Sequence, residues 1–255
     1  MNRYSSTVQY VGSGLKYLKN MINLDSIQQD SDYKIPEGIK TVFITSLASI
    51  IEGVIKSYLK SEIRAISINK EIIEKSLFQE KSEDDNAEVV ISFQKTVKEL
   101  RNDKSKNDKL INKIIEIELN KIESLTWEKL KQEFKKISND DLKTILNNHK
   151  PELSENIEAI FRFRNLFLHG NVIELKNKEN GGFEFQGRSK FLSDFIKKHN
   201  LEKENITSED HFIELLVTKK TMNFLFDKVY NEFLTLPKWS ESFETQNMIN
   251  LIWKK

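Results

Sequence analysis

Two arginines, an asparagine and a histidine stand close together in the segment FRFRNLFLHGN, residues 161–171. The remainder of the segment is mostly Phe and Leu, and the apolar run stops at a glycine. A guanidinium offers a planar fork of donors that suits phosphate oxygens, and an imidazole can take up or release a proton near neutral pH. The segment therefore either caps and solvates the end of a helix or gathers side chains that handle a phosphate.

Arg164, Asn165 and His169 form the pattern R-N-x-x-x-H, which a glycine follows. In a continuous α-helix residues i and i+4 share a face, so Asn165 could hold the imidazole of His169 by a hydrogen bond. Arg164 would lie about 140° around the helix from His169. One helix alone therefore cannot aim both groups at one phosphate unless its last turn deforms. Two copies that meet at a two-fold axis would bring two arginines and two histidines into one cleft.

This pattern resembles the Arg-x(4–6)-His signature of the HEPN superfamily of helical domains, and RNLFLHG is particularly similar to bacterial HEPN toxins and defence proteins, including the RiboL-PSP-like group. The segment SLASIIEGVIKSYL, with Glu52 in its middle, is similar to the family's first core helix. The resemblance implies an all-α, HEPN-like helical bundle with extra helices. It also implies a metal-independent endoribonuclease of a toxin–antitoxin, abortive-infection or other antiviral defence system. Implied partners are RNA, a second copy that completes a composite active site, and an antitoxin or another defence-system subunit.

The residue types fit the implied reaction. RNA can be cut when its 2′-OH attacks the neighbouring phosphate and leaves a 2′,3′-cyclic phosphate. A neutral His169 can remove the 2′-OH proton, and a second, protonated histidine can protonate the leaving 5′ oxygen. Arg164 can stabilise the phosphorane oxygens, and Glu52 can orient the arginine or the histidine. Arg162, which fits the wider form of the signature, and Arg188 are weaker candidates for contacts with RNA.

Other interpretations of the same residues stay open. His169 and both arginines can simply interact with the negative end of a helix dipole. Glu52 can be a solvent-facing residue. The chain can also be a non-catalytic HEPN-like subunit that binds RNA or a nucleotide, with residues 171–187 and Arg188 as a partner surface. A purely structural helical adaptor would make the motif a coincidence.

Composition limits the remaining classes of function. The chain has no cysteine, and no histidine or acidic cluster has ligand spacing, so we expect no metal and no cofactor. With 40 basic and 39 acidic residues, bulk charge gives no reason to expect nucleic-acid binding, which must depend on a local patch. No signal-like segment and no apolar run of about 18 residues is present, so we expect a soluble, cytoplasmic protein without a membrane partner. The other histidines, at 149, 199 and 211, are expected at the surface.

The chain has only eight glycines and three prolines, which favours long helices over many tight turns. We expect one domain over residues 1–255, with a lead-in at 1–35 and a small β-hairpin insertion at 171–187 that turns at Asn180-Gly181. Ser138 and Asn139 are the expected N-cap candidates for a short helix. Apolar spacing predicts helices at 36–63, 70–80, 87–100, 110–137, 140–148, 151–169, 189–199 and 208–234, and a last helix after Pro237.

Overall fold

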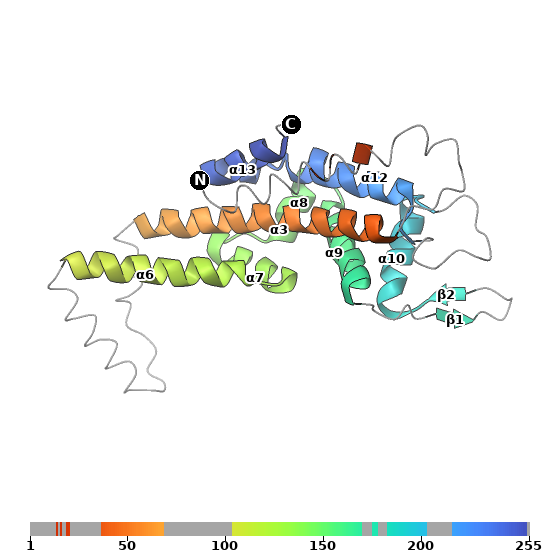
Figure 1. Ribbon diagram of the computed structural model, residues 1–255, viewed down its shortest axis with the longest axis horizontal. Coiled ribbons are helices and arrows are strands. Elements are labelled where there is room, and N and C mark those ends of the chain that lie inside the picture. Colours follow the sequence, from red (N-terminus) through yellow and green to blue (C-terminus); the bar gives the residue numbers. More distant parts are fainter. Residues whose placement is uncertain are drawn as a thin grey trace. The chain divides into compact units, whose positions relative to one another are not determined.

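The described part of the chain is mostly helical (Figure 1), which supports the predicted all-α class. The structure is a computed structural model, and it describes residues 14, 16, 19–20, 37–68, 104–169, 175–177, 183–202 and 216–253. Most of the predicted lead-in, and the helices predicted at 70–80 and 87–100, lie outside these residues.

The chain divides into two compact units. One unit consists of Met1–Ile55 and Asp140–Lys255, and the other is Lys56–Asn139. Helix α3 (Glu37–Ile68) begins in the first unit and ends in the second. The single domain predicted over residues 1–255 stays a prediction.

Helix α3 lies where the sequence predicts a long helix at 36–63. Its apolar residues recur every three or four positions, so they gather on one broad side of the helix. Val42 is apolar but lies outside that side and is 52% exposed. The reason is that it lies three and seven residues before Thr45 and Ser49, on the polar side. The fully buried residues in the first half of α3 are Phe43, Ile44, Leu47, Ala48, Ile50, Ile51, Val54 and Ile55.

The part of α3 from Gly38 to Ala65 is also long and apolar enough to cross a membrane, by length and composition alone. Charged residues such as Lys40, Glu52 and Lys56 interrupt this stretch, so it contains no continuous apolar run of the length expected for a membrane span. Half of its most apolar window is buried inside the protein, and core helices of soluble proteins satisfy the same criterion. The finding is therefore weak evidence for a membrane span.

In the unit Lys56–Asn139, two helices occupy the stretch where the sequence predicts one helix at 110–137. That prediction is wrong at positions 124–126, where the backbone leaves the helix. The hydroxyl of Ser124 donates to the carbonyl of Lys121 at 2.9 Å, and Thr126 is extended, with φ −73° and ψ 162°. Hydroxyl side chains compete in this way for backbone hydrogen bonds, which the spacing of apolar residues does not register. The two helices are α6 (Lys104–Glu123) and α7 (Trp127–Ser138), so α6 begins before position 110, where the predicted helix starts.

The core of this unit joins α3 to α6 and α7. Tyr58 of α3 stacks on Phe134 of α7, with ring centroids 5.6 Å apart. Lys56 donates from Nζ to the carbonyl of Glu123 at 2.9 Å, which satisfies a carbonyl group at the end of α6.

Two helices of the other unit lead into the motif segment, α8 (Leu142–His149) and α9 (Leu153–His169). The N-cap of α8 is Asp141, whose carboxylate accepts a hydrogen bond from the backbone N–H of Thr144 at 3.0 Å. The expected caps, Ser138 and Asn139, are therefore wrong. Ser138 still belongs to α7, and Asn139 has φ 58°, the left-handed conformation that closes α7.

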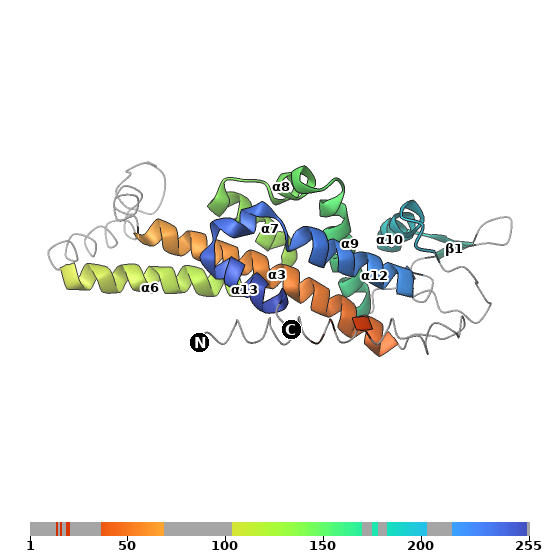
Figure 2. The ribbon, with the colours of Figure 1, turned by 90° about the horizontal axis from the view of Figure 1, so that it is seen from above.

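Helix α9 packs against α8, α10 (Gly187–Lys198) and η1 (Lys228–Phe233) (Figure 2). Between α9 and α10 lie two short antiparallel strands, β1 (Leu175–Asn177) and β2 (Phe183–Phe185). Leu175 pairs with Phe185 and Asn177 with Phe183. The predicted Asn180-Gly181 turn lies outside the described residues, and the hairpin insertion at 171–187 stays a prediction.

The helix predicted at 208–234 is interrupted. Residues 203–215 lie outside the described part, and the observed helix α12 (Lys219–Asp227) begins only after Thr218. Thr218 and Thr221 each accept a hydrogen bond from the other's backbone N–H, a capping box that fixes the start of α12. The next turns form the π-helix η1, in which Leu234 donates to the carbonyl of Val229 at 2.9 Å.

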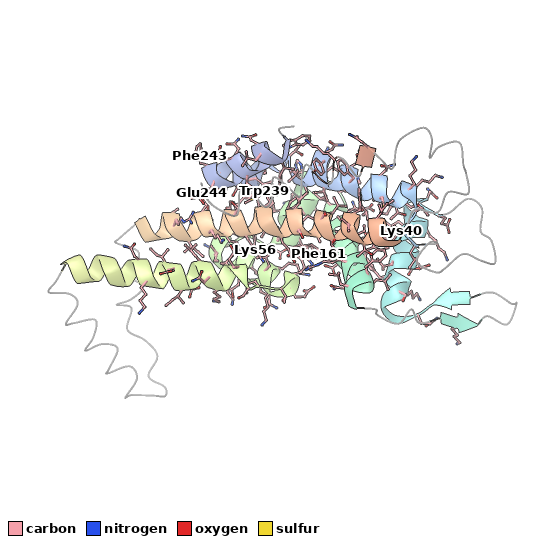
Figure 3. All side chains as sticks on the ribbon, viewed as in Figure 1. Lys40, Lys56, Phe161, Trp239, Phe243 and Glu244 are labelled. Atoms are coloured by element: carbon pink, nitrogen blue, oxygen red, sulfur yellow. The ribbon has the colours of Figure 1, made fainter. Side chains whose placement is uncertain are left out.

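The C-terminal segment is anchored by Trp239 (Figure 3). Its indole Nε1 donates to the carbonyl of Phe233 at 2.7 Å, and the two rings lie 5.3 Å apart. Trp239 belongs to the 3₁₀-helix η2 (Pro237–Glu241), after which α13 (Phe243–Trp253) forms the predicted last helix. Phe243, at the start of α13, is 77% exposed.

Candidate functional site

Helix α9 carries the candidate residues because its sequence separates an apolar side from a polar one. The polar candidates 162, 164 and 165 are half-buried or exposed. The helix ends at His169, and the glycine that follows the motif lies outside the described residues. The apolar residues of α9 with 0% exposure are Leu153, Ile157, Ala159, Ile160 and Phe163.

Arg164 reaches from α9 to Glu52 of α3. Its Nη1 lies 2.8 Å from Oε1 of Glu52, and the two side chains are 30% and 16% exposed. Of the two alternatives for Glu52, the structure therefore has the acidic neighbour of the motif arginine rather than a solvent-facing residue. Within the described part of the chain, the other guanidinium nitrogens of Arg164, Nε and Nη2, have no hydrogen-bond partner.

Arg162 points toward a different neighbour. Its Nε donates to Oε1 of Glu158, one turn earlier in α9, at 3.2 Å. Its guanidinium carbon lies 4.1 Å from the ring centroid of Phe191 in α10, a cation–π contact. Phe191 was not predicted as part of the site, since nothing in the linear pattern tells which aromatic residue of α10 meets α9.

The remaining predicted site residues are described less fully. Asn165 is exposed on α9. His169 is the last residue of α9 and Arg188 is the second residue of α10, but their side chains lie outside the described part. The structure thus brings together Arg164 and Glu52, and the predicted contact between Asn165 and His169 stays a prediction.

His199 and His149 are less exposed than the sequence suggested. The ring of His199 lies 4.7 Å from each of the rings of Phe195 and Phe224. Its Nε2 is buried and has no hydrogen-bond partner among the residues that the structure describes. His149 lies with Nε2 3.1 Å from the carbonyl oxygen of Glu232. The prediction of surface histidines is wrong for these two because tertiary packing covers the helix ends that carry them. His211 lies outside the described residues.

Burial lowers the pKa of His199 from its ordinary value of 6.5. The positive charges of Lys198 and Lys228 act in the same direction, and the carboxylates of Glu152 and Glu155 oppose the shift. The shift favours the neutral form of the ring. Packing between two phenylalanines gives His199 a structural role.

No group of three or more histidine, cysteine, aspartate or glutamate side chains that could hold a metal ion occurs among the described residues. The groups of α9 that could bind a ligand are the guanidinium groups of Arg162 and Arg164. They lie on different sides of the helix, and each is positioned by a carboxylate. Such groups suit phosphate oxygens.

Fold and site define an all-α protein in which a buried apolar helix supplies an acidic partner to an arginine of the motif helix. Comparisons with protein-family models, curated proteins and solved structures give no match.

Proposed function

We propose that the protein is a HEPN-type endoribonuclease that cleaves RNA without a metal ion. The observation that supports the proposal is the contact between Arg164 and Glu52. Arg164 of the motif and Glu52 of the apolar helix lie 112 positions apart in the chain, and both belong to segments that resemble the family. A coincidental motif gives no reason for these two residues to meet.

In the proposed reaction the 2′-OH of a ribose attacks the adjacent phosphate, the bond to the 5′ oxygen breaks, and a 2′,3′-cyclic phosphate remains. His169 of one protomer takes the 2′-OH proton, and the protonated His169 of the other protomer gives a proton to the leaving 5′ oxygen. Arg164 donates from Nε and Nη2 to the phosphorane oxygens, while its Nη1 stays bound to Glu52. Asn165 orients the imidazole.

The proposed active form is a homodimer, because the arginine and the histidine of one motif lie about 140° apart around their helix. The proposed setting is the cytoplasm, where the enzyme acts as a toxin or an antiviral defence effector that an antitoxin or another subunit restrains. The hairpin insertion and the HEPN-like bundle belong to the same proposal.

The test is cleavage of a mixed RNA substrate by purified protein, with products examined for 2′,3′-cyclic phosphate ends. We expect His169→Ala and Arg164→Ala each to lower cleavage at least about 100-fold, as loss of a transition-state donor does. We expect EDTA to leave the rate unchanged and light scattering to report a dimer for all variants.

Lys197→Ala, which removes an exposed cation from the far end of α10, is the matched control and should cleave like the parent protein. Cleavage that survives His169→Ala would contradict the proposal. RNA binding without any cleavage would instead favour a non-catalytic binding subunit, and in that case expression should not arrest cell growth.

A further inference from the structure

Arg162 is fixed from two directions and still presents donors. Its Nε is bound to Glu158 at 3.2 Å, and one face of its guanidinium is covered by the ring of Phe191 at 4.1 Å. The side chain nevertheless remains 40% exposed. Within the described part of the chain, Nη1 and Nη2 have no hydrogen-bond partner. The outer edge of the guanidinium is therefore a preorganised pair of parallel N–H donors.

The position of Arg162 along α9 relates it to the motif. Seven residues separate it from His169, which is about 20° short of two full helical turns and about 10.5 Å along the helix axis. Positions 162, 165 and 169 therefore lie on one side of α9. Arg164 lies about 140° around the helix from His169 and is bound to Glu52.

We propose that Arg162, held by Phe191 and Glu158, binds a phosphate of the RNA strand next to the linkage that is cleaved. This inference rests on the proposed ribonuclease function and adds a substrate-binding residue to it. Two parallel N–H groups match the two non-bridging oxygens of a phosphodiester, and a lysine could not reproduce that geometry. The stack on Phe191 removes much of the rotational freedom that a free arginine would lose on binding.

Phe191 supports the binding residue from the neighbouring helix. It is half-buried in α10 and contacts Phe195 with ring centroids 6.4 Å apart, so its ring is itself held by packing. Lys190, next to Phe191 in the first turn of α10, is exposed and adds a positive charge to that helix. An arginine with only a structural role would affect protein stability and leave RNA affinity unchanged.

The experiment measures the affinity of the full-length protein for a single-stranded RNA oligonucleotide by fluorescence anisotropy, at several salt concentrations. All variants carry His169→Ala so that the probe stays intact. Arg162→Gln should weaken binding roughly tenfold, as expected for loss of a charge-assisted contact. It should also reduce the slope of log Kd against log salt by about 0.7, the value for one phosphate contact on a single strand.

Two further variants separate geometry from charge. Arg162→Lys keeps the charge but loses the planar fork, so it should bind with intermediate affinity and keep most of the salt slope. Lys197→Gln removes one exposed cation from the far end of α10 and should leave both quantities close to those of the parent. Thermal unfolding of each variant establishes that it is folded, and Arg162→Lys carries the test if Arg162→Gln does not fold.

The outcomes for the inference and for the proposed function are distinguishable. If Arg162→Gln and Arg162→Lys both bind like Lys197→Gln while His169→Ala abolishes cleavage, the inference is overturned and the ribonuclease proposal stands. If His169→Ala still cleaves the probe, or the protein does not bind RNA, the proposed function fails and the inference fails with it.

Discussion

Replacement of Glu52 by glutamine tests whether the contact with Arg164 positions the motif. The variant keeps the size and shape of the side chain and removes the charge that faces Nη1 of Arg164 at 2.8 Å. Hydrogen bonds to charged groups contribute about 1.5–3 kcal/mol. Because Arg164 is 30% exposed, solvent screens part of this interaction, and we expect a loss of about 1–2 kcal/mol in the free energy of unfolding.

A double-mutant cycle with Arg164→Gln isolates the interaction from other effects of each substitution. Urea unfolding of the parent, the two single variants and the double variant should give a coupling energy of about 1 kcal/mol. The pair Lys131–Glu128 within α7 is the reference: its charges lie 2.8 Å apart and Glu128 is 68% exposed, so its coupling should not exceed about 0.5 kcal/mol. A coupling between Glu52 and Arg164 no larger than that of the reference pair would refute the reasoning.

The same variant should affect catalysis in a characteristic way. If Glu52 positions Arg164 for the transition state, Glu52→Gln should lower kcat severalfold and leave KM close to that of the parent. Glu52→Asp, which keeps the carboxylate, should recover part of the loss. Equal kcat for Glu52→Gln and the parent would show that the contact serves stability alone.

Three further predictions concern other parts of the fold. Asp141→Ala removes the carboxylate that caps α8 through the backbone N–H of Thr144, and it should lower the free energy of unfolding by about 1 kcal/mol in urea titrations. Asp141→Asn, which can still accept that bond, should recover most of this. Trp239→Phe removes one of the two donors to the carbonyl of Phe233, which still accepts from the backbone N–H of Leu236, and puts a smaller ring into a buried site. It should cost about 2–4 kcal/mol, whereas an exposed position such as Trp253→Phe should cost much less. Since burial lowers the pKa of His199, the unfolded chain binds the proton more readily, so stability present above about pH 6.5 should fall as the pH drops toward the lowered pKa. His199→Gln should flatten this dependence in urea unfolding, and an unchanged dependence would contradict the assignment.

Apolar periodicity predicted α3 because a buried helix must repeat its apolar residues every three or four positions. It failed between α6 and α7, where hydroxyl groups at 124 and 126 accompany the end of one helix and the start of the next without changing the apolar pattern. The start of α12 was missed for a similar reason, since Thr218 and Thr221 act through local hydrogen bonds. Boundaries therefore depend on short-range polar contacts that periodicity does not record.

One contact of the candidate site could be predicted from the sequence and another could not. The sequence singled out Arg164 and Glu52 by their types and by the helices that carry them, and these two residues meet. The contact of Arg162 with Phe191 could not be predicted in the same way. Phe191 belongs to another helix, and only the packing of α9 against α10 selects it from the aromatic residues near it.

The wide turns of the π-helix η1 mark a place where the chain can lose one residue and stay helical. A π-helical stretch corresponds to an α-helix with one additional residue. The hydrogen bond from the N–H of Leu234 to the carbonyl of Val229, five residues earlier, closes the wider turn. Loss of one residue between Lys228 and Phe233 would let ordinary α-helical winding resume while Trp239 keeps its place downstream. Natural variants of this chain that differ by a single-residue gap should therefore carry it here rather than inside α3 or α9.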